Sequence, residues 1–154
     1  MKAVVAYLLA LLAALVAMTY FDATSGLLSD HPELHLATRC SIAGAFGGVT
    51  YCLRGIYLSV SVRKDWDPTW LTWFFLRPFV SAITGTVSYV FIRAGLLVLE
   101  ASRHPDATTL GFLALAFIAG LNVDRFITRL EDLARAAWGI RPSRTAEASE
   151  KTGT

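Results

Sequence analysis

The stretch DHPELH, residues 30–35, is the only one in this sequence that looks suited to metal binding or acid–base chemistry. His31 and His35 stand four residues apart, with Glu33 between them. On a helix the two imidazoles would share a face, but Glu33 would point elsewhere, so a complete metal site is not expected. The chain also has no CxxC pair, nucleophile elbow or phosphate loop. We therefore expect no enzyme activity, no cofactor and no metal.

Arginines within apolar stretches form a second group of candidate functional residues. Arg93 lies in YVFIRAGLLVLE, residues 89–100. An arginine at the centre of a bilayer costs at least about 2.5–3.5 kcal/mol, so it usually faces a partner or a cavity. Either the arginines snorkel and pair with acids such as Asp22, Glu33 and Glu100, or they line an anion-attracting path in an oligomer. The candidates for ion pairs or for such a path are Arg39, Arg54, Arg77, Arg93, Glu100, Asn122 and Asp124.

The composition indicates that a lipid bilayer surrounds these arginines. Of 154 residues, 55% are hydrophobic, which exceeds the roughly 45–50% apolar share of a soluble domain. The net charge is only +2, and the basic residues of the tail are mixed with acids, so no nucleic-acid partner is expected. The two cysteines, Cys40 and Cys52, are twelve residues apart in one predicted helix and cannot form a disulfide there.

Four stretches of the sequence come close to the roughly 20 mostly apolar residues that a membrane-spanning helix needs. The sequence therefore predicts an all-α protein, a four-transmembrane-helix bundle, and the apolar start is expected to be an uncleaved anchor. The fourth helix is expected to continue unbroken from residue 107 to residue 138, because Gly139 is the first helix-ending residue after it. The predicted spans are about 4–21, 36–62, 78–99 and 107–123, with a cytoplasmic helical extension at 124–138, a membrane domain over 1–140 and a disordered tail at 141–154.

The basic residues predict how the spans are oriented. With the N-terminus inside, Lys2, Arg63, Lys64 and most later arginines fall on the inner side, whereas the outer side keeps only Arg39 and Arg103. Cytoplasmic loops carry the excess of Lys and Arg in inner-membrane proteins. We therefore expect a multi-pass protein of the bacterial inner (cytoplasmic) membrane with both termini in the cytoplasm. In this arrangement Arg54 and Arg77 lie near the inner surface and Arg39 and Arg93 toward the outer one.

Small residues at helical spacing predict how the spans pack. Lipid tails are as apolar as leucine, so transmembrane helices associate through closely fitting small residues and polar contacts. The second span repeats a small residue every four positions, and the third and fourth spans each hold one such pair. Packing within one bundle is the simpler interpretation, and a subunit interface is the alternative. The helix-packing residues are Cys40, Gly44, Gly48, Cys52, Ser81, Gly85, Ala116 and Gly120.

The extension of the fourth helix carries an apolar stripe opposite Arg129, Asp132 and Arg135. Two heptads are too few for an autonomous coiled coil. The stripe is expected either to lie on the inner leaflet or to pack against copies of itself. We favour self-association, because lying flat needs a break and no Pro or Gly stands between Asn122 and Trp138. The stripe consists of Val123, Phe126, Ile127, Leu130, Leu133 and Ala137.

Two stretches resemble a group of small bacterial inner-membrane proteins. They are LRPFVSAITGTVSYVFIRAGLL, residues 76–97, and LALAFIAGLNVDRF, residues 113–126. The resemblance lies in an Arg-Pro that opens a glycine-bearing third span and an Ala/Gly-rich fourth span that ends in a charged helix; its residues are Arg77, Pro78, Gly85, Gly120 and Asp124. It implies the four-span architecture and no activity.

Two functions of different class follow from the sequence. The first is a non-enzymatic membrane protein that forms a homo-oligomer and a pore or polar pathway lined by arginines. The alternative is an accessory or scaffold subunit that docks a protein partner through the cytoplasmic end of the fourth helix. Anion current lost on Arg93→Leu would favour the first, and a partner lost on truncation after Asn122 would favour the second.

Overall fold

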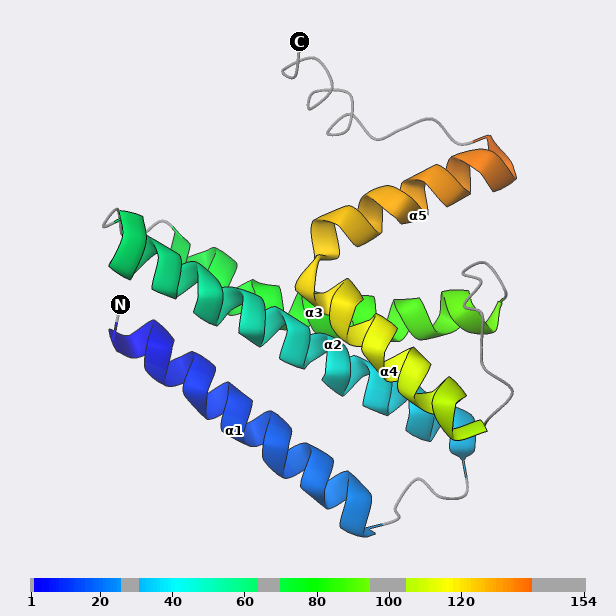
Figure 1. Cartoon of the computed structure of the whole chain (residues 1–154), viewed down its shortest axis with the longest axis horizontal. Helices are drawn as coiled ribbons and strands as arrows, with labels where there is room; N and C mark the ends of the chain where they lie inside the picture. Colours follow the sequence, from blue (N-terminus) through cyan, green and yellow to red (C-terminus); the bar gives the residue numbers. More distant parts are fainter. Residues whose placement is uncertain (1, 26–30, 64–69, 95–104, 140–154) are drawn as a thin grey trace. The chain divides into compact units, whose positions relative to one another are not determined.

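A computed structural model describes residues 2–25, 31–63, 70–94 and 105–139. Over these ranges every element is a helix, as the sequence predicts (Figure 1). The described helices form two compact units, one through Asn122 and one from Val123 onward. The predicted tail at 141–154 lies outside the described residues.

The first helix runs slightly beyond its predicted span, and the second continues into a π-helical segment. α1 extends over Lys2–Ser25, and α2 extends over Pro32–Tyr57. Pro32 stands in the first turn of α2, where its missing N–H leaves no hydrogen bond unmade. A π-helical segment, η1 (Leu58–Arg63), follows α2 directly. The predicted second span, 36–62, therefore falls within one continuous helical stretch.

The third helix, α3, extends over Leu71–Arg93 and contains Pro78. It starts seven residues before the predicted span at 78, as the apolar run of Trp and Phe residues ahead of Arg77 allows. The backbone nitrogen of Ala94 still bonds to the carbonyl oxygen of Val90. The predicted end of this span at residue 99 lies outside the described residues.

The fourth predicted helix is two helices in the structure. α4 extends over Pro105–Leu121, α5 extends over Val123–Trp138, and Asn122 stands in a turn between them. The expectation of one unbroken helix over 107–138 is therefore wrong. Asn is a poor helix former but a preferred residue at helix ends, because its short amide side chain competes for backbone hydrogen bonds. Gly139, with a φ of 64°, follows α5, as expected for a helix-ending glycine.

Within the first unit, α2 is the central helix. It contacts α3 most extensively, then α4 and α1 (Figure 1). One core cluster joins α1, α2 and α3 through Val4, Leu8, Cys52, Ile56 and Phe74. A second cluster joins Leu15 of α1 to α2, and a third joins Cys40 of α2 to Tyr89 of α3 and Ala116 of α4. The three outer helices thus cover α2 on several sides.

Glycines bring the backbones of α2, α3 and α4 into direct contact. A Cβ atom added to Gly85 of α3 would lie 2.4 Å from the carbonyl oxygen of Cys40 in α2. A Cβ added to Gly120 of α4 would lie 2.1 Å from the carbonyl oxygen of Gly44. Any larger residue would therefore separate the helices. Ser81 of α3 adds a hydrogen bond from its Oγ to the carbonyl oxygen of Gly120, at 2.9 Å.

The length and composition of the helices suit a membrane. Among the described residues, α1 and α3 are each long and apolar enough to cross one. A third crossing follows if the interrupted pair Thr109–Leu121 and Val123–Ala136 counts as one span.

Candidate functional site

Three polar side chains meet where α1 ends and α2 begins. Asp22, in the last turn of α1, accepts a hydrogen bond of 2.8 Å from Nε of Arg39. Nε2 of His35, one turn earlier on α2, lies 3.0 Å from the other carboxylate oxygen. The Asp22 side chain is 14% exposed, whereas that of Arg39 is 37% exposed. One carboxylate thus holds two α2 side chains.

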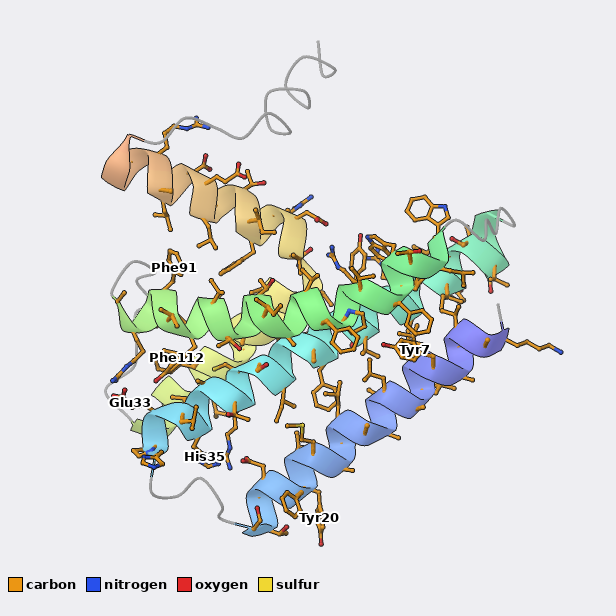
Figure 2. The ribbon with its side chains drawn as sticks, turned by 180° about the vertical axis from the view of Figure 1, so that it is seen from behind. Tyr7, Tyr20, Glu33, His35, Phe91 and Phe112 are labelled. Atoms are coloured by element: carbon orange, nitrogen blue, oxygen red, sulfur yellow. The ribbon has the colours of Figure 1, made fainter. Side chains whose placement is uncertain are left out.

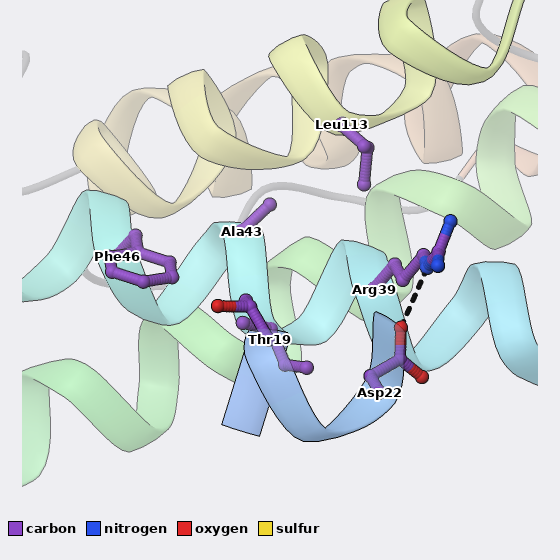
Figure 3. A pocket seen from close by; sticks show the side chains of 7 residues that line it. Thr19, Asp22, Arg39, Ala43, Phe46 and Leu113 are labelled. Atoms are coloured by element: carbon purple, nitrogen blue, oxygen red, sulfur yellow. Dashed lines mark hydrogen bonds and ion pairs between the residues drawn. The ribbon is translucent and has the colours of Figure 1, made fainter. Parts of the chain in front are cut away.

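A cavity of about 240 Å³ opens beside this pair, between α1, α2 and α4 (Figure 3). Asp22 and Arg39 form its polar part, and Figure 3 shows their hydrogen bond. The rest of the lining is mostly apolar and comprises Thr19, Ile42, Ala43, Phe46 and Leu113. Its α2 residues lie on one face, because their spacing of three and four residues follows the helical repeat. The cavity is therefore amphipathic.

Arg93 also has an acidic partner, at the same end of the bundle. Its Nη2 donates to Oε1 of Glu33, which joins the end of α3 to the first turn of α2. Figure 2 shows Glu33 and His35 together at this end of α2. The two side chains of the pair are 53% and 73% exposed. Of the counterions considered for Arg93, Glu33 is in contact, Asp22 bonds to Arg39, and Glu100 lies outside the described residues.

Arg77 is the most buried charged residue of the described chain, with 5% exposure. Its guanidinium carbon lies 4.8 Å from the ring centroid of Tyr51 and 5.3 Å from that of Trp73. An aromatic face attracts a cation through its quadrupole, most strongly where water is excluded. Arg77 is thus enclosed by rings from α2 and α3, whereas Arg54, predicted near it, is exposed on α2.

The remaining predicted polar candidates lie at the boundary between the units. Asn122 is partly buried at the end of α4, and Asp124 is exposed in the first turn of α5. The Asp124 carbonyl oxygen accepts a hydrogen bond from the Thr128 hydroxyl at 3.0 Å.

The residues predicted to pack helices are all buried: Cys40, Gly44, Gly48, Cys52, Ser81, Gly85, Ala116 and Gly120. Gly47 of α2 is also at a contact, because a Cβ there would lie 2.3 Å from the Phe117 carbonyl oxygen.

The second unit offers one amphipathic helix. The α5 stripe repeats at three- and four-residue intervals from Val123 to Ala137, and Ile127 within it is 44% exposed. The charged residues of α5 occupy the opposite side. Three arginines and three acids give α5 no net formal charge.

Sequence reasoning did not find two of these arrangements. It named Asp22 among several possible acidic partners but did not predict its contacts with Arg39 and His35, because the rotation of α1 against α2 is not encoded in either helix alone. The spacing of Arg39, Ala43 and Phe46 on one face of α2 was an available signal. The rings around Arg77 were also missed, although Trp73 stands one helical turn before it.

Within the described ranges, no group of three or more His, Cys, Asp or Glu residues is placed to hold a metal ion, and Asp30 of the DHPELH stretch lies outside those ranges. Comparisons with protein-family models, with curated proteins and with solved structures give no match to this chain.

Proposed function

We propose that the protein is a non-enzymatic, multi-pass membrane scaffold. In this proposal α1–α4 cross the bilayer as a bundle, and α5 docks a protein partner at the cytoplasmic face. The observation that carries it is α5 itself, an amphipathic helix that starts at the Asn122 break and belongs to a separate compact unit.

Large apolar side chains on the outside of the bundle support its place in a membrane. On α1, Phe21 is 60% exposed, and on α3, Phe79 and Ile83 are 61% and 64% exposed. Soluble monomers rarely expose contiguous apolar patches of more than a few hundred Å². A lipid environment covers such side chains at no cost.

Four crossings, rather than two or three, are supported by the central place of α2. Its 26 residues give a length of about 39 Å, enough to cross a hydrocarbon core of about 30 Å. α2 is less apolar than α1 and α3, but three neighbours shield it, and its polar residues His35 and Arg39 pair with Asp22. α4, with 17 residues, reaches about 26 Å, the lower end of the range for a span.

A protein partner suits α5 better than a bare bilayer surface or a second copy. Helices that lie on anionic membranes usually carry an excess of Lys and Arg on the polar face, whereas α5 has as many acids as arginines. Its stripe covers only two heptads, which is short for a self-sufficient coiled coil. An apolar stripe of this spacing is the form in which an amphipathic helix enters a groove of another protein.

Cysteine accessibility tests the scaffold. Ile127→Cys places a thiol on the apolar stripe, and Arg129→Cys places a matched thiol on the charged side. In native membranes we expect an aqueous maleimide to label the Ile127→Cys thiol far more slowly than the Arg129→Cys thiol. After purification into nanodiscs of the same lipids, the partner is removed and both thiols should react alike. Protection of the Ile127→Cys thiol that persists in the nanodiscs would contradict the scaffold and indicate lipid or a second copy.

A second candidate is the arginine-lined pathway in an oligomer. The exposed side chains of Arg54 and Arg93 favour it, because both are accessible on the outside of one chain and would face a shared lumen if copies assembled around it. The pairing of Arg93 with Glu33 weighs against it. Anion current through reconstituted protein that disappears with Arg93→Leu would support the pathway, and silent bilayers would exclude it.

A further inference from the structure

The cavity between α1, α2 and α4 has a polar end and apolar walls, which is the pattern of a site for an amphiphile. Its polar end holds Arg39 and Asp22, and the wall beyond includes Ala43, Phe46 and Leu113 (Figure 3). Along α2, Phe46 lies seven residues after Arg39, a distance of about 10 Å at the helical rise. A ligand that contacts both must therefore combine a charged group with an apolar part at least that long.

The hydrogen-bond donors at the polar end suit an anion. Asp22 is already engaged, since its carboxylate accepts from Arg39 and lies beside His35. A guanidinium has five N–H donors in a fixed fork, and the bond to Asp22 uses the one on Nε. The terminal nitrogens of the partly exposed Arg39 are suited to a bidentate contact with a phosphate. Arg39 and Asp22 together carry no net formal charge, so an incoming phosphate meets no net repulsion from this pair.

The depth of the site suits a lipid. Asp22 lies three residues before the end of α1, and Arg39 lies seven residues after the start of α2. Both are thus within about 10 Å of the helix ends, which is near the headgroup level of a bilayer that the bundle crosses. The apolar walls then run from this level toward the hydrocarbon core.

We propose that this cavity binds one phospholipid, whose phosphate contacts Arg39 and one of whose acyl chains lies along Ala43, Phe46 and Leu113. The proposal rests on the membrane-embedded bundle proposed above. It adds a specific ligand to a bundle that otherwise serves only as an anchor.

Native mass spectrometry of the full-length protein in detergent tests the site. The probes are phosphatidylethanolamine with one palmitoyl and one oleoyl chain, diacylglycerol with the same chains, and inorganic phosphate. We expect one phosphatidylethanolamine per chain and binding of diacylglycerol weaker by about tenfold or more, because the charge-assisted hydrogen bonds to phosphate are absent. Inorganic phosphate alone should not be retained. Equal binding of diacylglycerol, or retention of phosphate alone, would overturn the proposal.

Two variants test the two ends of the site separately, and a third serves as the control. Arg39→Leu removes the phosphate contact, whereas Ala43→Phe fills the apolar part and leaves both charged residues in place. Each should weaken phosphatidylethanolamine binding by about tenfold or more. Ala14→Phe, at an exposed α1 position outside the cavity lining, is the matched control and should bind like the wild type. Ala43→Phe tests the site independently if Arg39→Leu fails to fold. Unchanged binding by a folded Ala43→Phe protein would overturn the proposal.

Carbonate extraction of membranes distinguishes failure of this site from failure of the proposed function. Protein that stays in the membrane pellet but binds phosphatidylethanolamine no better than diacylglycerol would overturn the lipid site alone. Protein released by carbonate would overturn the membrane-embedded bundle and the lipid site with it.

Discussion

Asp22 joins the end of α1 to α2 through two contacts, one with Arg39 and one with His35. Glu33 joins α2 to the end of α3 through Arg93, but both of those side chains are more than half exposed. An exposed ion pair is screened by water and costs side-chain entropy to hold in one geometry. The two acidic residues therefore differ in how much they stabilise the bundle, although each pairs with an arginine of a neighbouring helix.

Asp22→Asn tests this difference. The variant weakens both contacts of a carboxylate that is only 14% exposed, and we expect the free energy of unfolding in detergent to fall by about 1.5–3 kcal/mol. Glu33→Gln is the matched control and should change it by no more than about 1 kcal/mol. A denaturant titration of both proteins gives the comparison. Equal losses in the two variants would show that burial does not set the strength of these pairs.

At the scale of the helices, the contact of α2 with α3 and α4 depends on the absence of side chains. Gly85→Ala would place a Cβ 2.4 Å from the Cys40 carbonyl oxygen, and overpacking of this kind typically costs about 1–3 kcal/mol. Gly111→Ala on α4 meets no atom within 4 Å and should stabilise the helix, by up to about 1 kcal/mol. Thermal unfolding in detergent measures both. Destabilisation by Gly111→Ala as large as that by Gly85→Ala would contradict the account of close backbone contact.

The hydrogen bond from Ser81 to Gly120 holds α3 and α4 together at this contact. Ser81→Ala should lower the stability of the bundle by about 0.6 kcal/mol, the average for bonds between transmembrane helices. Ser88→Ala is the control, because its equally buried hydroxyl bonds to Gly85 of its own helix and should matter less. A denaturant titration in detergent measures both variants. A larger loss of stability in Ser88→Ala than in Ser81→Ala would contradict this assignment.

At the scale of the whole molecule, the sequence predicted the helical class and the approximate helix bounds, because long apolar windows and small residues at four-residue spacing are local signals. It did not predict the break at Asn122, since one short polar residue lacks the strength of Pro or Gly as a helix-ending signal. It also did not predict which acid meets which arginine. Those pairs depend on how helices rotate against one another, and that is decided by packing across the bundle.

The central claim is that α1–α4 cross the membrane four times. Topology reporters inserted at residues 26–30, at residues 64–69 and after Thr154 test it most directly. Four crossings with the N-terminus inside predict the first insertion on the outer side of the membrane and the other two in the cytoplasm. If only α1 and α3 crossed, the insertions at 26–30 and 64–69 would report the same side of the membrane, and that result would contradict the account.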